Sequence, residues 1–118
     1  MFVLHVDLLT NGDTQSKSLA ADKMPALEEV FATTFRPAID KQSGFVAVTL
    51  LRSTEDTTQY RLVIAFESRK HQQQWTATDL HGQVWPQMAA VCDSYSVRYF
   101  EDTQDNSTTG PFRQTSVI

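Results

Sequence analysis

The stretch YRLVIAFESRKHQQQWTATDLH, residues 60–81, changes from a strand pattern to a helical pattern. Its first part, 60–67, is mostly aromatic, β-branched and aliphatic, which predicts a buried strand. Ser68 can accept a hydrogen bond from a backbone N–H in the first turn of a helix, so it predicts a helix start. We therefore expect a strand that leads directly into a helical region over residues 68–92.

Two helical regions are expected, and each contains residues that oppose a regular helix. Apolar residues spaced by three and four positions predict the first helix over residues 16–40. Pro37 should kink or end it. Gly82 and Pro86 interrupt the second region, so we expect two helical pieces with a break between residues 78 and 86.

The remaining strands complete a recognisable order. Residues 2–9, 45–52 and 93–100 are rich in apolar and β-branched residues, and a polar loop joins the second strand to the third. The order strand-helix-strand-strand-helix-strand predicts an α+β, ferredoxin-like fold: an antiparallel four-stranded sheet with both helices on one face. We expect one domain over residues 1–101 and a polar, flexible tail over 102–118.

The first three strands are apolar on both sides, whereas a sheet with one face in water should alternate apolar and polar residues. Two helices cover only one face, so a second subunit is the simplest cover for the other. We therefore expect a homodimer that packs sheet to sheet. Strict alternation places Phe45, Ala47 and Leu51 opposite Val46, Val48 and Leu50, but the sequence leaves open which side meets the partner. The candidates for the open face are Phe2, Leu4, Val6, Val48, Leu50, Leu62 and Ile64.

Composition excludes several classes of protein. The chain has 118 residues, of which 41% are hydrophobic and 20% charged, with a net charge of −4. No apolar run reaches the length of a membrane span, and an acidic chain is a poor ligand for nucleic acid. Cys92 is the only cysteine and the three histidines are scattered, so no disulfide and no metal site is expected. The N-terminal residues lack a basic leader, so we expect a cytoplasmic protein.

Residues 2–101 resemble the antibiotic biosynthesis monooxygenase family of dimeric α/β-barrel proteins. The resemblance rests on the element order, on Gly44-Phe45 at the start of the second strand, and on IAFESRKHQQQWTATDLH at 64–81. It implies a small homodimer with a pocket between the helices and the sheet. Several members oxidise quinols or polycyclic aromatic phenols with O₂ and without a metal or an organic cofactor, and one branch degrades haem.

The haem-degrading branch fits this sequence poorly. It implies an asparagine in the first strand, a tryptophan in the helix after the third strand, and a haem-ligating histidine about ten residues later. Trp75 matches the tryptophan, but Asp7 and Trp85 occupy the other two positions. Haem degradation is therefore disfavoured, and no cofactor is expected.

Three residues of the second helical region are candidates for a site. In a continuous helix, His81 would share the apolar face of Trp75 and Trp85. A histidine in an aromatic pocket can take a phenolic proton and leave an electron-rich phenolate that reduces O₂. The two tryptophans can contact an aromatic substrate. The alternatives are a capping or exposed His81 and two tryptophans that belong only to the core.

The first strand supplies two further candidates, His5 and Asp7, which project from the same side because they are two residues apart. Asp7 could orient a catalytic histidine or bind a substrate hydroxyl, and His5 could contact the substrate. Alternatively, Asp7 forms a structural ion pair with Arg61 or Arg98, and His5 is structural.

Two functions from different classes remain. The leading hypothesis is a cofactor-independent monooxygenase that oxidises a small aromatic quinol or polycyclic phenol, with His81 as base and Asp7 as orienting group. The alternative is a non-catalytic dimeric module that binds a small molecule or only assembles. Convergence of His81, Asp7 and Trp75 on one cavity would favour catalysis, and its failure would favour the alternative.

Overall fold

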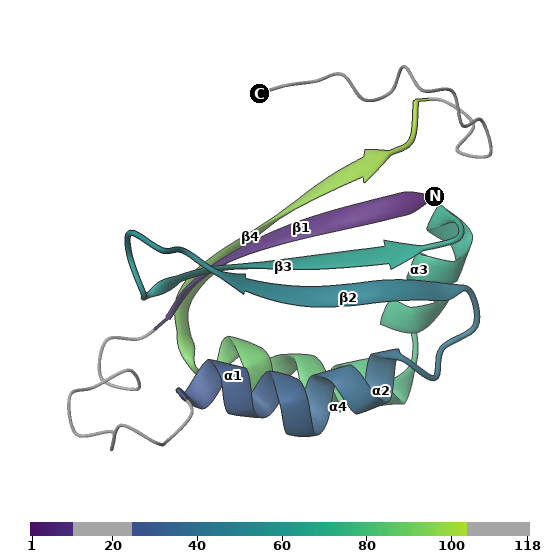
Figure 1. Cartoon of the computed structure of the whole chain (residues 1–118). Coiled ribbons are helices and arrows are strands. Elements are labelled where there is room, and N and C mark those ends of the chain that lie inside the picture. Colours follow the sequence, from purple (N-terminus) through teal and green to yellow (C-terminus); the bar gives the residue numbers. More distant parts are fainter. Residues whose placement is uncertain (11–24, 104–118) are drawn as a thin grey trace.

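The computed structural model describes residues 1–10 and 25–103 of the chain, so the expected helix over 16–24 and nearly all of the expected tail lie outside the described residues. Four strands and three helical segments make up the described part, and the first of these segments is continuous through α1, η1 and α2 (Figure 1). The elements are β1 (Phe2–Thr10), α1 (Ala26–Val30), the π-helix η1 (Phe31–Phe35), α2 (Arg36–Ile39), β2 (Phe45–Arg52), β3 (Gln59–Phe66), α3 (Arg69–Thr76), α4 (Asp79–Ala89) and β4 (Cys92–Glu101).

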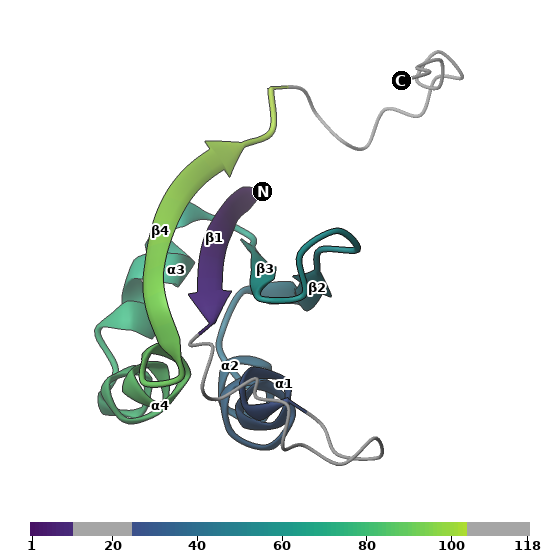
Figure 2. The same cartoon turned by 90° about the vertical axis from the view of Figure 1, so that its left-hand side faces the viewer.

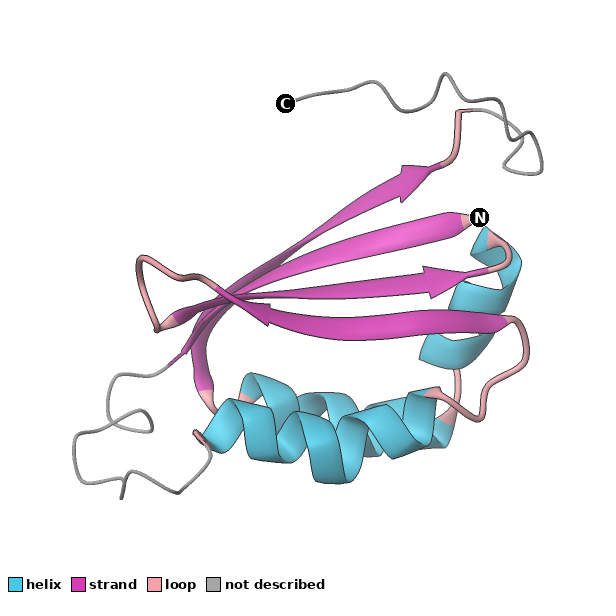
Figure 3. Ribbon diagram, in the orientation of Figure 1, coloured by secondary structure: helices cyan, strands magenta, loops and turns pink. Residues whose placement is uncertain are grey.

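The strands form one antiparallel sheet in the order β2-β3-β1-β4. All the helices lie on one side of it (Figure 3). Viewed from the side, the long helix α1-η1-α2 runs beneath β3 and β2, whereas α3 and α4 lie beside the curved β4 (Figure 2). The α+β, ferredoxin-like architecture predicted from the sequence is therefore confirmed.

The buried core forms where the central strands face the helices. Leu4 pairs with Ile64 and Val6 with Leu62, so one side of β1 and β3 presents a continuous apolar surface. Met88 of α4 packs over it, and both Leu62 and Met88 have no exposed surface. The residues considered for an open, partner-facing surface lie here instead, packed beneath the helices: Phe2, Leu4, Val6, Val48, Leu50, Leu62 and Ile64.

The alternation predicted for β2 is wrong at its first residue. The register shifts between Phe45 and Ala47, so Phe45 pairs with Phe66 and contacts that ring edge-on at 6.1 Å. The irregularity brings Phe45 to the same core-facing side as Val48. A β-bulge inserts an extra residue in one strand and so reverses the parity of the residues before it.

Pro37 was expected to kink or end the first helix, and it does not end it. It lies in the first turn of α2, directly after the π-helical turn, and the helix continues to Ile39. In that turn the Arg36 N–H donates to the Phe31 carbonyl, five residues back. In a π turn, each backbone N–H donates to the carbonyl five residues back instead of four. This change of partners falls next to Pro37, which has no N–H to donate, and the helix continues on both sides of it.

The break in the second helical region falls at Ala77 and Thr78, the first edge of the predicted interval. The Thr78 hydroxyl accepts a hydrogen bond from the His81 N–H at 3.1 Å and caps α4. Gly82 and Pro86 both lie inside α4. The capping side chain therefore determines where the chain changes direction, rather than the two residues with the lowest helix propensity.

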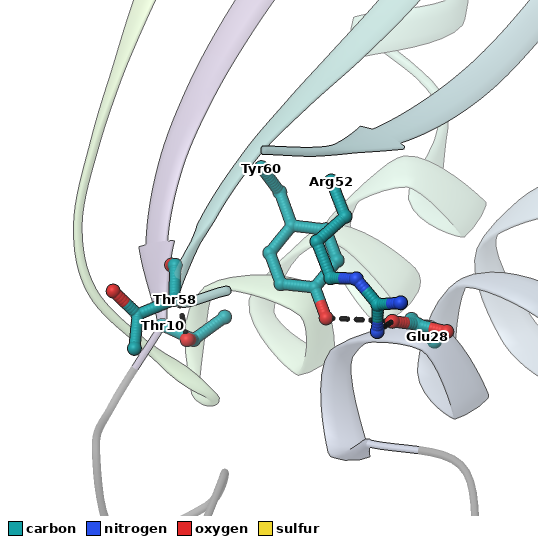
Figure 4. A network of polar contacts seen from close by, with 5 residues as sticks. All are labelled: Thr10, Glu28, Arg52, Thr58 and Tyr60. Carbon is teal, nitrogen blue, oxygen red and sulfur yellow. Dashed lines mark hydrogen bonds and ion pairs between the residues drawn. The ribbon is translucent and has the colours of Figure 1, made fainter. Parts of the chain in front are cut away.

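A polar network joins the start of β3 to the long helix (Figure 4). The Tyr60 hydroxyl donates to a Glu28 carboxylate oxygen at 2.7 Å, and the Arg52 guanidinium contacts the same oxygen at 2.9 Å. Next to it, the Thr10 hydroxyl donates to the Thr58 carbonyl at 3.1 Å. Burial, with a contribution from Glu28, raises the pKa of Tyr60 to about 12, so this hydroxyl remains a donor at neutral pH.

The two described glycines provide a matched test of the fold. Gly44 has a φ of +76°, and a Cβ at this position would collide with the His71 ring. A hydrogen bond of 2.8 Å between Ser68 Oγ and His71 Nδ1 holds that ring in place. We expect Gly44→Ala to lower the free energy of unfolding by about 2 kcal/mol or more, because strain and collision add. Gly82→Ala is the control: nothing lies near its Cβ, and alanine should raise stability by about 0.5–1 kcal/mol. Urea denaturation measures both, and equal stabilities for the two variants would contradict this account.

Candidate functional site

A cavity of about 220 Å³ lies between the core-facing side of the sheet and the helices α3 and α4. Leu4, Val6 and Ile64 form its floor. Its outer wall is β4, where Tyr95 is 49% and Tyr99 56% exposed. The cavity is therefore apolar at its base and open to solvent along β4.

Aromatic rings form the helical wall of the cavity. Trp75, only 3% exposed, meets Phe35 edge-on with ring centroids 6.1 Å apart. Trp85 contacts Phe35 at 6.2 Å and Tyr95 at 5.1 Å. Such edge-to-face contacts fix the rings in place, so the aromatic wall is preformed. The two tryptophans predicted from helical spacing do line one site, and Trp75 belongs to the core as well.

His81 joins these aromatic residues. Its ring stands at 87° to the Trp75 indole, with centroids 5.1 Å apart, and it lines the cavity. Burial lowers the pKa of His81, so at neutral pH the imidazole is uncharged and has a free lone pair. Its ring nitrogens make no hydrogen bond to any residue that the structure describes. A neutral, unoccupied imidazole beside an aromatic surface can accept a proton from a bound ligand.

Asp7 and His5 do not reach this cavity, because they lie on the opposite side of β1. Asp7 accepts hydrogen bonds from Arg61 at 2.7 Å and from Arg98 at 3.0 Å. The hydrogen bond from Arg61, followed by that from Arg98, lowers the pKa of Asp7 although its partial burial opposes the shift. His5 lies against the Phe100 ring at 4.8 Å. The geometry is that of the structural alternative, and within this chain Asp7 does not orient His81.

A second hollow, of about 480 Å³, lies on the open side of the sheet beside Asp7, Arg61, Ser94 and Ser96. It is larger than the aromatic cavity, but only half of its lining is apolar. Its carboxylate is already bound by two arginines. The aromatic cavity therefore offers the better combination of apolar surface and an available base.

Gln72 and Tyr95 are among the residues of the aromatic cavity that the sequence did not single out. Gln72, 7% exposed, lies one turn before Trp75 on α3, and Tyr95 faces α4 from β4. Helical spacing places Gln72 on the same face as Trp75, and that signal could have identified it. It belongs to the run Gln72-Gln73-Gln74, which reads as a solvated polar segment.

Among residues 1–10 and 25–103, no group of three or more histidine, cysteine or acidic side chains could hold a metal ion. The position ten residues after Trp75 holds Trp85, whose indole cannot ligate haem iron and which contacts Phe35 and Tyr95. In the same ranges, no helix has the length and apolar character to cross a bilayer.

The sequence model of the antibiotic biosynthesis monooxygenase family matches residues 15–85, which is more than half of the chain. The chain belongs to this family. The match includes both tryptophans and His81, so the aromatic cavity lies largely within the family region. A search of curated protein sequences finds no match.

Solved structures of the family share this fold at low sequence identity. SnoaB, a cofactor-independent oxygenase from Streptomyces nogalater, is 18% identical, with a TM-score of 0.70 over 88% of this chain and 94% of its own. A candidate antibiotic biosynthesis monooxygenase from Nitrosomonas europaea is 17% identical, with a TM-score of 0.69 over 88% of this chain and all of its own. A third, from Deinococcus radiodurans, is 9% identical with a TM-score of 0.70, over 93% of this chain and 100% of its own.

The burial of His81 predicts a pH-dependent stability. The unfolded chain binds a proton at this residue near pH 6.5, and the folded protein binds it only at lower pH. Between these two values the unfolded state carries more protons, so the free energy of unfolding rises with pH. His81→Gln should remove this contribution and flatten the stability curve below about pH 7. Urea denaturation across that range measures it, and parallel curves for parent and variant would contradict the buried, neutral imidazole.

Proposed function

We propose that this member of the antibiotic biosynthesis monooxygenase family is a cofactor-independent monooxygenase that oxidises a small aromatic quinol or phenol. The observation that carries the proposal is the neutral His81 imidazole, held edge-on against Trp75 at 5.1 Å in an aromatic cavity. Family membership supports a monooxygenase-type reaction. SnoaB, which shares the fold, is itself a cofactor-independent oxygenase.

The proposed reaction requires one catalytic group from the protein, a base. His81 accepts the proton of a bound phenol, and the resulting phenolate is electron-rich enough to reduce O₂. A bond forms between substrate carbon and oxygen, and the O–O bond then breaks. One oxygen atom remains in the product as a carbonyl and the other leaves as water, so the substrate supplies all the electrons. No external reductant is needed.

The size of the cavity limits the substrate. A dry cavity of about 150 Å³ is known to hold benzene, and the cavity here measures about 220 Å³. It therefore suits one ring or two fused rings, with further rings extending past Tyr95 and Tyr99 into solvent. A hydroquinone or naphthol-sized phenol fits better than a fully enclosed polycyclic one.

His81 and Trp75 line one cavity but Asp7 does not, and this failed convergence favours a second candidate, a dimeric module that binds an aromatic molecule without transforming it. Family membership keeps the monooxygenase as the leading proposal. Asp7 is engaged by Arg61 and Arg98 on the other side of the sheet, so it does not give His81 the carboxylate that often orients a catalytic histidine. Under this alternative the cavity and its aromatic wall remain, but the histidine only contacts the ligand.

We also propose a homodimer formed through the open side of the sheet. The open side carries the apolar residues Val3, Val63 and Phe100, and Leu51 on the same side is 48% exposed. The helices cover only the other side of the sheet (Figure 3). An apolar surface of this kind is usually covered in solution. The Asp7 cluster at its centre would enter the interface with its carboxylate already paired, which reduces the cost of its burial.

Oxygen consumption tests the enzymatic proposal. With hydroquinone or naphthol substrates and no added metal or flavin, we expect uptake of O₂ that falls about 100-fold or more in His81→Ala and His81→Gln, because both lack the base. Gln83→Ala, an exposed position on the same helix, is the control and should retain the parent rate. Binding of these phenols without O₂ uptake by the parent protein would instead support the non-catalytic module.

Light scattering at micromolar concentration tests the dimer. We expect a dimer for the parent chain, and loss of the folded dimer in Val63→Asp, because a carboxylate at the centre of the interface opposes packing. Leu62→Asp should unfold the chain instead, since Leu62 is fully buried under the helices. A folded parent protein with the mass of one chain would overturn the proposal.

A further inference from the structure

The aromatic cavity contains one polar side chain that the proposed chemistry does not use. Gln72 lies on α3, is 7% exposed and lines the cavity together with Trp75 and His81. Its backbone N–H donates to the Ser68 carbonyl. Its side-chain amide makes no hydrogen bond or ion pair with any residue that the structure describes.

The other polar groups around the cavity are accounted for. The Thr76 hydroxyl donates to the Gln73 carbonyl at 3.0 Å. Tyr95 and Tyr99 are about half exposed and stand at the solvent side. His81 is the base of the proposed reaction. Gln72 is therefore the deeply buried polar group of this site that is left without a partner in the described structure.

A buried amide without a hydrogen bond lowers stability by about 1–3 kcal/mol relative to a satisfied one. Buried polar side chains in proteins nearly always have partners, so an exception calls for a physical reason. An apolar residue would fill this position at no such cost. A ligand with its own polar atom, bound in the cavity, would provide the missing partner.

We propose that Gln72 is a specificity-determining residue whose amide binds an oxygen substituent of the aromatic ligand, so that the cavity selects aromatic molecules carrying two oxygens, one at His81 and a second at Gln72. This proposal rests on the proposed function in one respect, that the aromatic cavity is the ligand site. It does not depend on the oxidation reaction, because a ligand can bind without being turned over. The amide has both a donor and an acceptor, so it can bind a hydroxyl before oxidation and a carbonyl after it.

The positions of the two polar groups support this assignment. Gln72 precedes Trp75 by one helical turn, about 4.5 Å along the helix axis. His81 contacts the same indole from the first turn of α4. A flat ligand against Trp75 therefore has one polar group of the protein on α3 and another on α4, with apolar floor between them from Leu4 and Ile64.

Calorimetry without oxygen tests the proposal on matched ligands. The probes are 1-naphthol, which has one oxygen, and its 1,4-, 1,5- and 1,8-dihydroxy analogues, which add a second at different positions. The parent protein should bind at least one diol about tenfold more tightly than 1-naphthol, the effect of one good hydrogen bond. In Gln72→Leu that preference should fall to about twofold or less, with the affinity for 1-naphthol little changed.

A control and a second readout separate binding from structure. Gln73→Leu, exposed on the next position of α3, should keep the preference of the parent. Thermal unfolding of Gln72→Leu should show an equal or higher Tm, because an unsatisfied amide is replaced by an apolar side chain. A lower Tm together with equal losses of affinity for all four ligands would show a structural role and overturn the proposal.

The proposal is also overturned if no diol binds the parent protein more tightly than 1-naphthol does. Neither result depends on oxygen consumption. A protein that shows the preference but takes up no O₂ would retain the Gln72 assignment while losing the monooxygenase. A protein that oxidises naphthols without any preference for a second oxygen would retain the monooxygenase assignment and lose the role proposed for Gln72.

Discussion

The antiparallel pairing of β1 with β3 is the constraint on which the rest of the structure depends. Successive side chains of a strand point to opposite sides, so the register that pairs Val6 with Leu62 beneath the helices also pairs Asp7 with Arg61 on the open side. The burial of the core and the separation of Asp7 from His81 thus have one cause. A rotamer change cannot bring the Asp7 carboxylate to the aromatic cavity. A shift of the strand register could, but it would move the core residues of β1 to the open side.

The cavity exists because the second helical region bends at Thr78. The capping hydroxyl ends α3 and begins α4, so Trp75 closes one helix and His81 opens the next with their rings in contact. In a continuous helix the six-residue spacing would separate them by about 9 Å along the axis and about 120° around it, too far for ring contact. The bend places a neutral imidazole and a flat indole together while Gln72 remains one turn away on α3. The buried Gln72 amide without a partner in the described structure lowers stability, a cost that functional sites commonly carry.

Much of the architecture was predictable from the chain alone. The ends of β2 and the approximate ends of the other strands follow from runs of β-branched and aromatic residues bounded by polar segments. The helices follow from apolar spacing and from the capping Ser68, and the order of elements determines the ferredoxin-like fold. His81, Trp75 and Trp85 were identified by helical spacing, and they do line one cavity.

The sequence by itself therefore determined the elements, their order and the aromatic part of the site, because these depend on local propensity and periodicity. Only the tertiary structure decided which side of each strand meets the helices, since a strand that is apolar on both sides has no preferred face until it packs. It likewise decided the bulge at Phe45 and the engagement of Asp7 by Arg61 and Arg98. Each of these depends on contacts between residues far apart in the chain, and no local pattern encodes them.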